Sequence, residues 1–153
     1  MKHLLIVHHS QTGNTERLAQ AAREAAQDLP DLNLEIRYLL AAAAGSQDLR
    51  WADGLLLATP ENFGYMSGAL KDFFDRTFYE VEGQLSPLPY ALMISASNDG
   101  TGAERAIARI VGGYPLVAVQ PTLIARGPIT QAHLEQAAEL GATLAAGLDA
   151  GIY

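Results

Sequence analysis

The chain has 153 residues, of which 49% are hydrophobic and 18% are charged, and its 10 Lys and Arg against 17 Asp and Glu give a net charge of −7. This composition excludes a disordered chain, and the acidic balance argues against nucleic acid or an anionic membrane as a partner, because both are bound through clustered cations. The absence of cysteine excludes disulfide frameworks, cysteine nucleophiles, iron–sulfur clusters and cysteine-ligated zinc.

The length fits one domain, and we expect residues 1–153 to form a single unit. Only four apolar residues, 4–7, follow the amino-terminal Met-Lys-His, which is too few for the apolar region of an export signal. No run approaches the roughly 20 apolar residues of a membrane-spanning helix. We therefore expect a cytoplasmic protein without a membrane partner.

Five short apolar runs predict β-strands at residues 4–8, 34–39, 54–58, 90–95 and 116–125. The first, third and fourth runs are apolar without alternation, which is typical of strands covered on both faces. Gln120-Pro121 interrupts the last run. Because proline cannot donate a ladder hydrogen bond, we expect that strand to lie at an edge of the sheet or to be broken there.

Segments with helical periodicity lie between these runs. Apolar stripes predict helices around residues 18–29, 70–78, 103–111 and 134–148, with a weaker helix near 41–51. Ser67 and Thr130 are candidate N-caps, and Pro30 and Gly112-Gly113 end two of the stripes. This alternation of strand and helix predicts a parallel sheet with helices on both faces.

The loop after the first predicted strand carries the clearest chemical signal, because ligands of such sheets bind beyond the carboxyl ends of the strands. The loop reads Ser10-Gln11-Thr12-Gly13-Asn14-Thr15 and leads directly into a helix. Hydroxyl and amide side chains, a glycine and the N–H groups at a helix start together form a phosphate cradle. The loop contains no Gly-Lys-Ser/Thr and no Lys or Arg, so we expect a single phosphate monoester rather than a triphosphate. The alternative is an ordinary turn in which Thr12 or Asn14 caps the helix.

Residues 10–15 resemble the phosphate-binding loop of the flavodoxin-like FMN proteins. Residues 59–68, Thr-Pro-Glu-Asn-Phe-Gly-Tyr-Met-Ser-Gly, followed by Leu70-Lys71-Asp72-Phe73, resemble the loop after the third strand in flavodoxin-like NAD(P)H-dependent FMN and quinone reductases. The resemblance spans the whole chain in element order. It implies an α/β flavodoxin-like three-layer sandwich around a five-stranded parallel sheet of order 2-1-3-4-5, with FMN at the switch point.

The resemblance also implies which residues bind the cofactor. Ser10, Gln11, Thr12, Gly13, Asn14 and Thr15 would hold the FMN phosphate; Thr59, Pro60, Glu61, Asn62, Phe63 and Gly64 would contact the ribityl chain and the ring; Ser97, Asn98, Asp99, Gly100 and Gly102 would meet the opposite edge of the flavin. The last group could instead be a glycine-rich turn before a helix. Phe63 and Tyr65 are the candidate aromatic neighbours of the ring.

Two departures from typical electron-carrying flavodoxins bear on function. Residues 97–102 contain no aromatic side chain, so we do not expect an aromatic sandwich on both flavin faces, and an open face could admit a nicotinamide or a quinone. Residues 61–82 contain five acids but only two basic residues, Lys71 and Arg76. This excess predicts negative charge near the ring and a lowered reduction potential of the flavin. The alternative is that these acids form a solvated helix face.

We expect no metal site, because His3, His8 and His9 lack a second cluster and are better explained as packed side chains, and we name no catalytic side chain. The expected function is that of an FMN-binding flavoprotein, an oxidoreductase in which NAD(P)H could reduce a quinone, a flavin or a similar small-molecule acceptor. One alternative is a flavodoxin-type electron-transfer carrier that serves a redox protein partner, and another is a domain that has lost FMN. The sequence leaves the acceptor, the choice between NADH and NADPH, and a homo-oligomeric state open.

Overall fold

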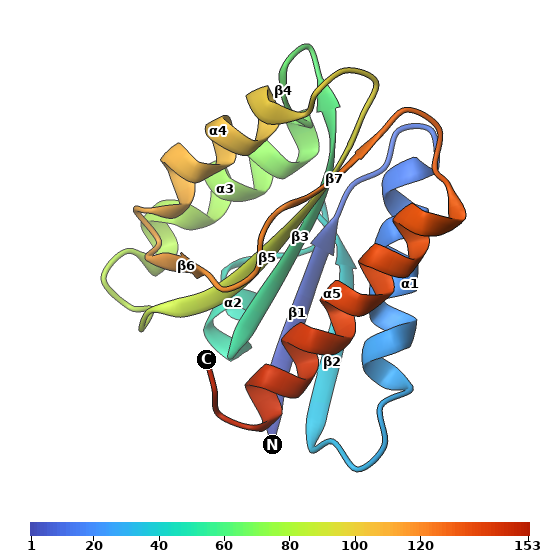
Figure 1. Cartoon of the computed structure of the whole chain (residues 1–153). Coiled ribbons are helices and arrows are strands. Elements are labelled where there is room, and N and C mark those ends of the chain that lie inside the picture. The colour runs from blue at the N-terminus through green and yellow to red at the C-terminus, as the bar shows by residue number, and fades with distance from the viewer.

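The computed structural model describes residues 1–153 as one sheet between two layers of helices (Figure 1). The strands are β1 (Lys2–His8), β2 (Leu34–Leu40), β3 (Gly54–Asn62), β4 (Tyr65–Met66), β5 (Leu88–Ala96), β6 (Leu116–Ala118) and β7 (Leu123–Arg126). The helices are α1 (Asn14–Gln27), α2 (Ser46–Trp51), α3 (Gly68–Val81), α4 (Thr101–Val111) and α5 (Gln131–Asp149).

The main sheet is parallel and has the strand order β2-β1-β3-β5-β6, with β7 also paired to β5. Strands β6 and β7 therefore share the fifth position of the sheet, and Gln120-Pro121 lies in the gap between them. This arrangement confirms both the flavodoxin-like order 2-1-3-4-5 and the predicted break in the last strand. The break follows from the missing N–H of proline, which cannot continue the ladder with β5.

Helices α1 and α5 cover one face of the sheet, and α2, α3 and α4 cover the other (Figure 1). In β1, Leu4 and Ile6 contribute to the core under α1 and α5, whereas Leu5 and Val7 contribute to the core under the other three helices. All four side chains are fully buried. The uninterrupted apolar run of β1 thus reflects the two-residue repeat of a strand whose faces are both covered.

A close approach between α1 and α5 depends on one glycine. A Cβ atom placed on Gly141 would lie 2.2 Å from the carbonyl oxygen of Ala22, well inside van der Waals contact. Small residues on both helices allow the backbones to meet, and any side chain at residue 141 would push α5 away from α1. This contact fixes the position of α1, whose first turn borders the candidate site described below.

The predicted helix caps are present. The hydroxyl of Ser67 accepts a hydrogen bond of 3.2 Å from the N–H of Leu70 at the start of α3, and Thr130 accepts one from the N–H of His133 at the start of α5. The weak helix expected near residues 41–51 forms only from Ser46 onward, because the alanines before it form a turn. Propensity alone therefore overestimated the length of α2, since alanine at an element boundary does not specify where the helix begins.

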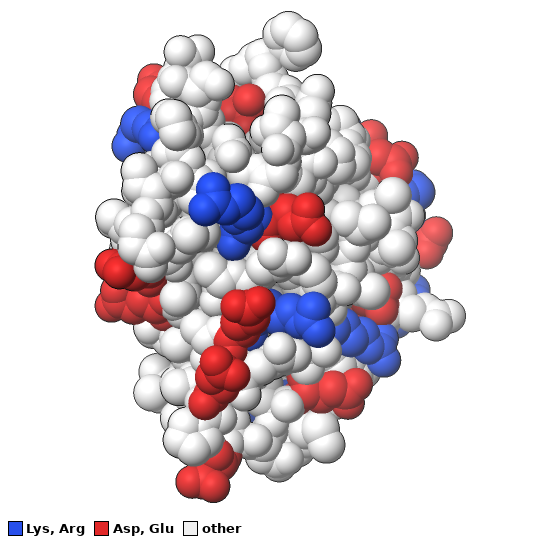
Figure 2. Space-filling model, turned by 90° about the vertical axis from the view of Figure 1, so that its right-hand side faces the viewer, with Lys and Arg blue, Asp and Glu red and all other residues white.

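Charged side chains of both signs are dispersed over the face that α1 and α5 present to solvent (Figure 2). This face carries no extended cationic surface of the kind that a nucleic acid requires. None of the helices combines the length and the apolar character needed to cross a lipid bilayer.

Candidate functional site

The loop between β1 and α1 is shaped by its own hydrogen bonds. Gly13 has φ +98°, a left-handed conformation that few other residues adopt, and its N–H donates a hydrogen bond of 3.0 Å to the hydroxyl of Ser10. The buried hydroxyls of Thr15 and Ser95 share a hydrogen bond of 2.7 Å, which ties the start of α1 to the end of β5. Ser10, Gly13 and Thr15 thus build the loop, and Gln11, Thr12 and Asn14 face the space beyond it.

The first turn of α1 offers unpaired N–H groups to that space. Gly13, the N-cap residue, has no side chain that could cap the helix. The first N–H groups of α1 therefore have no side-chain acceptor at the N-cap. The helix runs for 14 residues, and its dipole adds partial positive charge at this end. Arg17, one turn into the helix, also borders the space. Hydroxyl and amide groups, free N–H groups and one guanidinium are a donor set that fits a phosphate monoester.

The segment after β3 is a hairpin rather than the open loop that the sequence suggested. Strand β3 continues to Asn62, and its last two residues pair antiparallel with β4, so that Glu61 lies opposite Met66 and Asn62 opposite Tyr65. Thr59 to Asn62 therefore belong to the strand, and only Phe63-Gly64 forms the turn. The apolar run ends at Ala58 and did not reveal the extension, because residues 59–62, Thr-Pro-Glu-Asn, break the apolar pattern.

Phe63 and Gly64 both have positive φ angles, 53° and 71°, as a two-residue type I′ hairpin turn requires. For a bulky residue such as phenylalanine this conformation is an outlier, and such outliers gather at functional sites. The ring of Phe63 is fully exposed, and Tyr65 is 41% exposed. The turn thus holds an aromatic ring in solvent at the tip of the hairpin.

Hydrogen bonds on both sides hold the hairpin in place. The amide of Asn62 donates to the side-chain oxygen of Gln11 over 3.1 Å, which joins the hairpin to the loop after β1. A carboxylate oxygen of Glu61 accepts a bond of 3.0 Å from the N–H of Ala103 in the first turn of α4. The carboxylate of Glu61 thus stabilises the start of α4 through both the hydrogen bond and the helix dipole.

Gly102 brings the start of α4 into contact with the hairpin turn. A Cβ atom at residue 102 would lie 2.1 Å from the carbonyl oxygen of Gly64, a distance that no real side chain allows. Thr59 fixes the other end of the hairpin, since its buried hydroxyl accepts a hydrogen bond of 3.0 Å from the N–H of Ser67. The hairpin is therefore clamped between the first loop, α3 and α4.

The loop after β5 is a tight turn before α4. One carboxylate oxygen of Asp99 accepts hydrogen bonds from the N–H and the hydroxyl of Thr101, at 2.9 and 2.8 Å, and these bonds lower the pKa of Asp99. Gly100 is left-handed, with φ +76°, and is packed against Ile124. Ser97 borders the same space as Gln11, whereas Asn98 and Asp99 are exposed beside it.

These loops surround a cleft of about 740 Å³ at the carboxyl ends of the strands, which is within the usual size range of ligand sites. The cleft is lined by residues from four segments: Gln11, Thr12, Asn14 and Arg17; Pro60, Glu61 and Asn62; Ser95, Ala96 and Ser97; and Gly127, Pro128 and Ile129. The structure thus brings the three predicted segments together in one place, and a fourth segment, after β7, completes the walls.

The predicted cofactor-binding residues separate into two sets. Gln11, Thr12, Asn14, Pro60, Glu61, Asn62 and Ser97 line the cleft. Ser10, Gly13, Thr15, Thr59, Phe63, Gly64, Asn98, Asp99, Gly100 and Gly102 lie in the same segments without lining it. Contact of either set with a cofactor stays a prediction.

Sequence reasoning missed Arg17 and residues 127–129. Arg17 lies three residues after Asn14, so it shares a helix face with the loop, and helical spacing could have included it. The turn at Gly127-Pro128 follows the last strand, and it was identifiable as a turn from composition alone. Of the five acids between residues 61 and 82, only Glu61 lines the cleft, since Asp72 and Asp75 form ion pairs with Arg76 and Lys71 on the exposed face of α3.

His8 lies at the end of β1 and is not available as a ligand. The residue is 4% exposed, and its ring stacks on Tyr38 of β2, with 4.2 Å between the ring centres. Burial lowers the pKa of His8 and raises the pKa of Tyr38 to about 12, so both side chains are neutral at pH 7. The interpretation of His8 as a packed histidine is therefore consistent with its surroundings.

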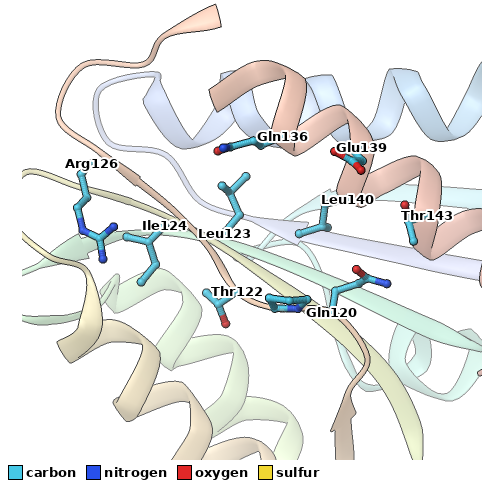
Figure 3. A pocket seen from close by; sticks show the side chains of 10 residues that line it. Gln120, Thr122, Leu123, Ile124, Arg126, Gln136, Glu139, Leu140 and Thr143 are labelled. Carbon is cyan, nitrogen blue, oxygen red and sulfur yellow. The ribbon is translucent and has the colours of Figure 1, made fainter. Parts of the chain in front are cut away.

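A second cavity, of about 440 Å³, lies between β7 and α5 (Figure 3). Leu123 and Leu140 form its apolar floor, and Gln136 and Glu139 border it from the helix. None of the predicted cofactor-binding residues lines this groove. The predicted cofactor-binding residues therefore contribute to the cleft at the carboxyl ends of the strands and not to this cavity.

Comparison with known proteins agrees with this geometry. Residues 1–125 match the model of a family described as NADPH-dependent FMN reductase. A flavodoxin of Aquifex aeolicus is 29% identical over 111 residues, which cover 72% of this chain and 59% of that protein. An NAD(P)H dehydrogenase (quinone) of Acidithiobacillus ferrooxidans is 28% identical over 95 residues, which cover 50% of this chain and 48% of that protein. The chain thus spans about half of the length of these curated relatives.

The fold is also that of solved flavodoxins. The crystal structure of oxidised flavodoxin 1 from Bacillus cereus superposes with a TM-score of 0.82 at 18% identity, and covers 96% of this chain and 99% of that one. A flavodoxin, WrbA-like protein from Agrobacterium tumefaciens gives a TM-score of 0.74 at 19% identity, covering 95% and 96%. At such identities the likeness shows the fold alone. By the family match over most of its length, the chain belongs to the NADPH-dependent FMN reductase family of flavodoxin-like FMN flavoproteins.

Proposed function

We propose that the cleft binds FMN and that the protein passes electrons from a reduced nicotinamide nucleotide to a small acceptor such as a quinone or a flavin. The observation that carries this proposal is the start of α1, where uncapped N–H groups, Thr12, Asn14 and Arg17 meet in one cleft. We further propose that residues 1–153 act as a single flavodoxin-like domain in the cytoplasm.

In this proposal each wall of the cleft has a distinct task. The loop after β1, the first turn of α1 and Arg17 would hold the phosphate, since an anion is stabilised there by N–H groups and by the guanidinium. The hairpin residues Pro60 to Asn62 and, across the cleft, Ser97 would border the rest of the cofactor. Bound FMN supplies the redox chemistry, and the chain supplies binding, orientation and electrostatics.

The clamped hairpin would position the cofactor relative to its electron donor. Because Asn62 is bonded to Gln11 and Glu61 to Ala103, the hairpin cannot move without breaking contacts to both neighbouring segments. Such preorganisation lowers the cost of ordering groups upon binding. The exposed ring of Phe63 would lie beside the open side of the cofactor and exclude water from it.

A flavodoxin-type electron carrier is the second candidate, and the fully exposed Phe63 favours it. A solitary aromatic ring in solvent is the kind of side chain that anchors a protein partner. The two candidates differ in what reduces the cofactor: a reductase accepts electrons from the nicotinamide nucleotide directly, whereas a carrier accepts them from another protein.

One experiment tests the proposal in two steps. Purified protein is titrated with FMN, and quenching of the flavin fluorescence at a stoichiometric endpoint is expected; protein that leaves micromolar FMN unquenched would refute cofactor binding. The FMN-loaded protein is then mixed with NADPH or NADH in a stopped-flow spectrometer. Rapid bleaching at the flavin absorption band supports the reductase, and bleaching only with a reduced redox protein supports the carrier. Light scattering of the loaded protein measures whether it is a monomer or an oligomer.

A further inference from the structure

A cationic groove lies beside the hairpin and is separate from the cleft. It has a volume of about 430 Å³ and is lined by Tyr65, Lys71, Arg105, Ala106, Arg109 and Ile110. No acid is among these residues, although the chain as a whole carries a net charge of −7. An acid-free cavity with three cations on an acidic protein indicates a site for an anion rather than a general feature of its surface.

Two of the three cations form no ion pair with an acid of the chain and are available to bind an anion. Lys71 is paired with Asp75 at 2.7 Å, and this hydrogen bond raises the pKa of Lys71. The four ion pairs of the chain include neither Arg105 nor Arg109. These two arginines are four residues apart on α4, so their side chains project from the same face of the helix. Two guanidinium groups on one face match phosphate oxygens, which arginine binds through paired hydrogen bonds.

The rest of the lining suits a planar, partly apolar group. Ala106 and Ile110 provide apolar surface from α4, and the ring of Tyr65 stands opposite on β4. A nucleic-acid base stacks on an aromatic ring or on the plane of an arginine side chain. A ligand that combines phosphate groups with a stacking base is a nucleotide.

One hairpin contributes residues to both the groove and the cleft. Asn62 lines the cleft, and its cross-strand partner Tyr65 lines the groove. Residues paired across antiparallel strands are only about 5 Å apart, so the two cavities adjoin at this hairpin. In Figure 1, β4 lies at the amino-terminal end of α4. A ligand with two ends could therefore place one end in the groove and reach around the Phe63-Gly64 turn with the other.

We propose that this groove binds the phosphorylated adenosine end of the nicotinamide dinucleotide, with Arg105 and Arg109 on its phosphates and Tyr65 against its base. The inference rests on the proposed reductase function, because it locates the electron donor of that reaction. An acidic protein partner would also be attracted to the two arginines, but a concave lining with an aromatic wall fits a small ligand better than a protein surface.

The test measures binding of adenosine 2′,5′-bisphosphate by isothermal titration calorimetry to the FMN-loaded protein. Binding to the unaltered protein should weaken at least tenfold in the double variant Arg105→Ala/Arg109→Ala. It should be unchanged in the control Lys2→Ala/Arg50→Ala, which removes two cations at the other end of the sheet. Unphosphorylated adenosine should bind at least tenfold more weakly than the bisphosphate.

Three results would overturn the inference: no binding of the bisphosphate, equal binding by both double variants, or binding only of an acidic peptide such as hexaglutamate. The calorimetry needs no electron transfer, so its outcome does not depend on whether NADPH reduces the bound flavin. If the bisphosphate binds in the groove but NADPH never bleaches the flavin, the groove is a nucleotide site and the reductase proposal fails. If NADPH bleaches the flavin with the same half-saturating concentration in all variants, the reductase stands and the groove is not its donor site.

Discussion

The contact between Gly102 and the hairpin turn predicts a measurable effect of a single methyl group. In the variant Gly102→Ala the new Cβ would begin 2.1 Å from the carbonyl oxygen of Gly64, and an ordinary contact starts near 3.4 Å. Because the obstacle is backbone rather than a flexible side chain, α4 and the hairpin must separate by about 1 Å. Overpacking of this kind costs about 1–3 kcal/mol of unfolding free energy.

Two further effects act on the same variant. The separation lengthens the bond from the N–H of Ala103 to Glu61, and hydrogen bonds to charged groups contribute about 1.5–3 kcal/mol. Alanine is the better helix former by at most about 1 kcal/mol, which offsets part of this loss. The net expectation is a destabilisation of about 2 kcal/mol, or a fall in Tm of about 4–8 °C for a chain of this size.

The matched control is Gly68→Ala, which adds the same methyl group at the start of α3, where nothing lies within 4 Å of the new atom. This variant should gain up to about 1 kcal/mol from the smaller entropy of its unfolded chain. Thermal unfolding by circular dichroism compares the two. If Gly102→Ala unfolds at or above the Tm of the unaltered protein, the close approach of α4 to the hairpin is wrong. FMN and riboflavin should bind Gly102→Ala with similar losses, because the phosphate loop is untouched.

Three other substitutions test separate parts of the structure. Thr12→Glu places a carboxylate at the expected phosphate position and should weaken FMN at least tenfold more than riboflavin in fluorescence titrations; equal losses would contradict a phosphate site there. Burial lowers the pKa of His8 in the folded chain below its unfolded value near 6.5, so the unfolded chain binds this proton more tightly. Folding stability should therefore fall as the pH decreases below about 6.5. His8→Phe, which keeps a ring against Tyr38, should flatten the dependence of the urea midpoint between pH 7 and pH 5, and an unchanged slope would exclude His8 as its cause. Ser67→Ala removes the acceptor for the Leu70 N–H and should cost about 1 kcal/mol by urea unfolding, and no loss would mean that the cap does not stabilise α3.

The order of elements was predictable because each buried strand is marked by a short apolar run and each helix by an apolar stripe. Strand β1 shows this best: Leu4 to Val7 are all apolar because helices cover both of its faces. The boundaries were harder to predict. Strand β3 extends past Ala58 because Thr59 and Pro60 pair with β5 and because Glu61 and Asn62 pair with β4. The turn between β3 and β4, Phe63-Gly64, is not one of the residue pairs that usually signal a hairpin.

The candidate site was predictable in part for a similar reason. The loop from Ser10 to Thr15 carries its chemistry in consecutive residues, so it can be recognised without knowing the fold. Arg17 reaches the cleft only because α1 begins at Asn14, and Gly127 to Ile129 only because β7 ends beside β5. The groove at Arg105 and Arg109 was not visible in the sequence, since its wall at Tyr65 is supplied by a hairpin about forty residues earlier in the chain.

The interruption of the fifth strand at Gln120-Pro121 has a consequence for how copies of this protein can associate. A continuous edge strand offers a row of free N–H and C=O groups on which another chain can extend the sheet. Here that edge is divided into segments of three and four residues, and the proline between them has no N–H to offer. The side chain of Gln120 donates a hydrogen bond of 2.6 Å to the hydroxyl of Tyr153, which ties the gap to the segment after α5. Two copies that met at this edge could not form one uninterrupted intermolecular sheet, so this edge is protected against edge-to-edge association, whereas β2 leaves the opposite edge continuous.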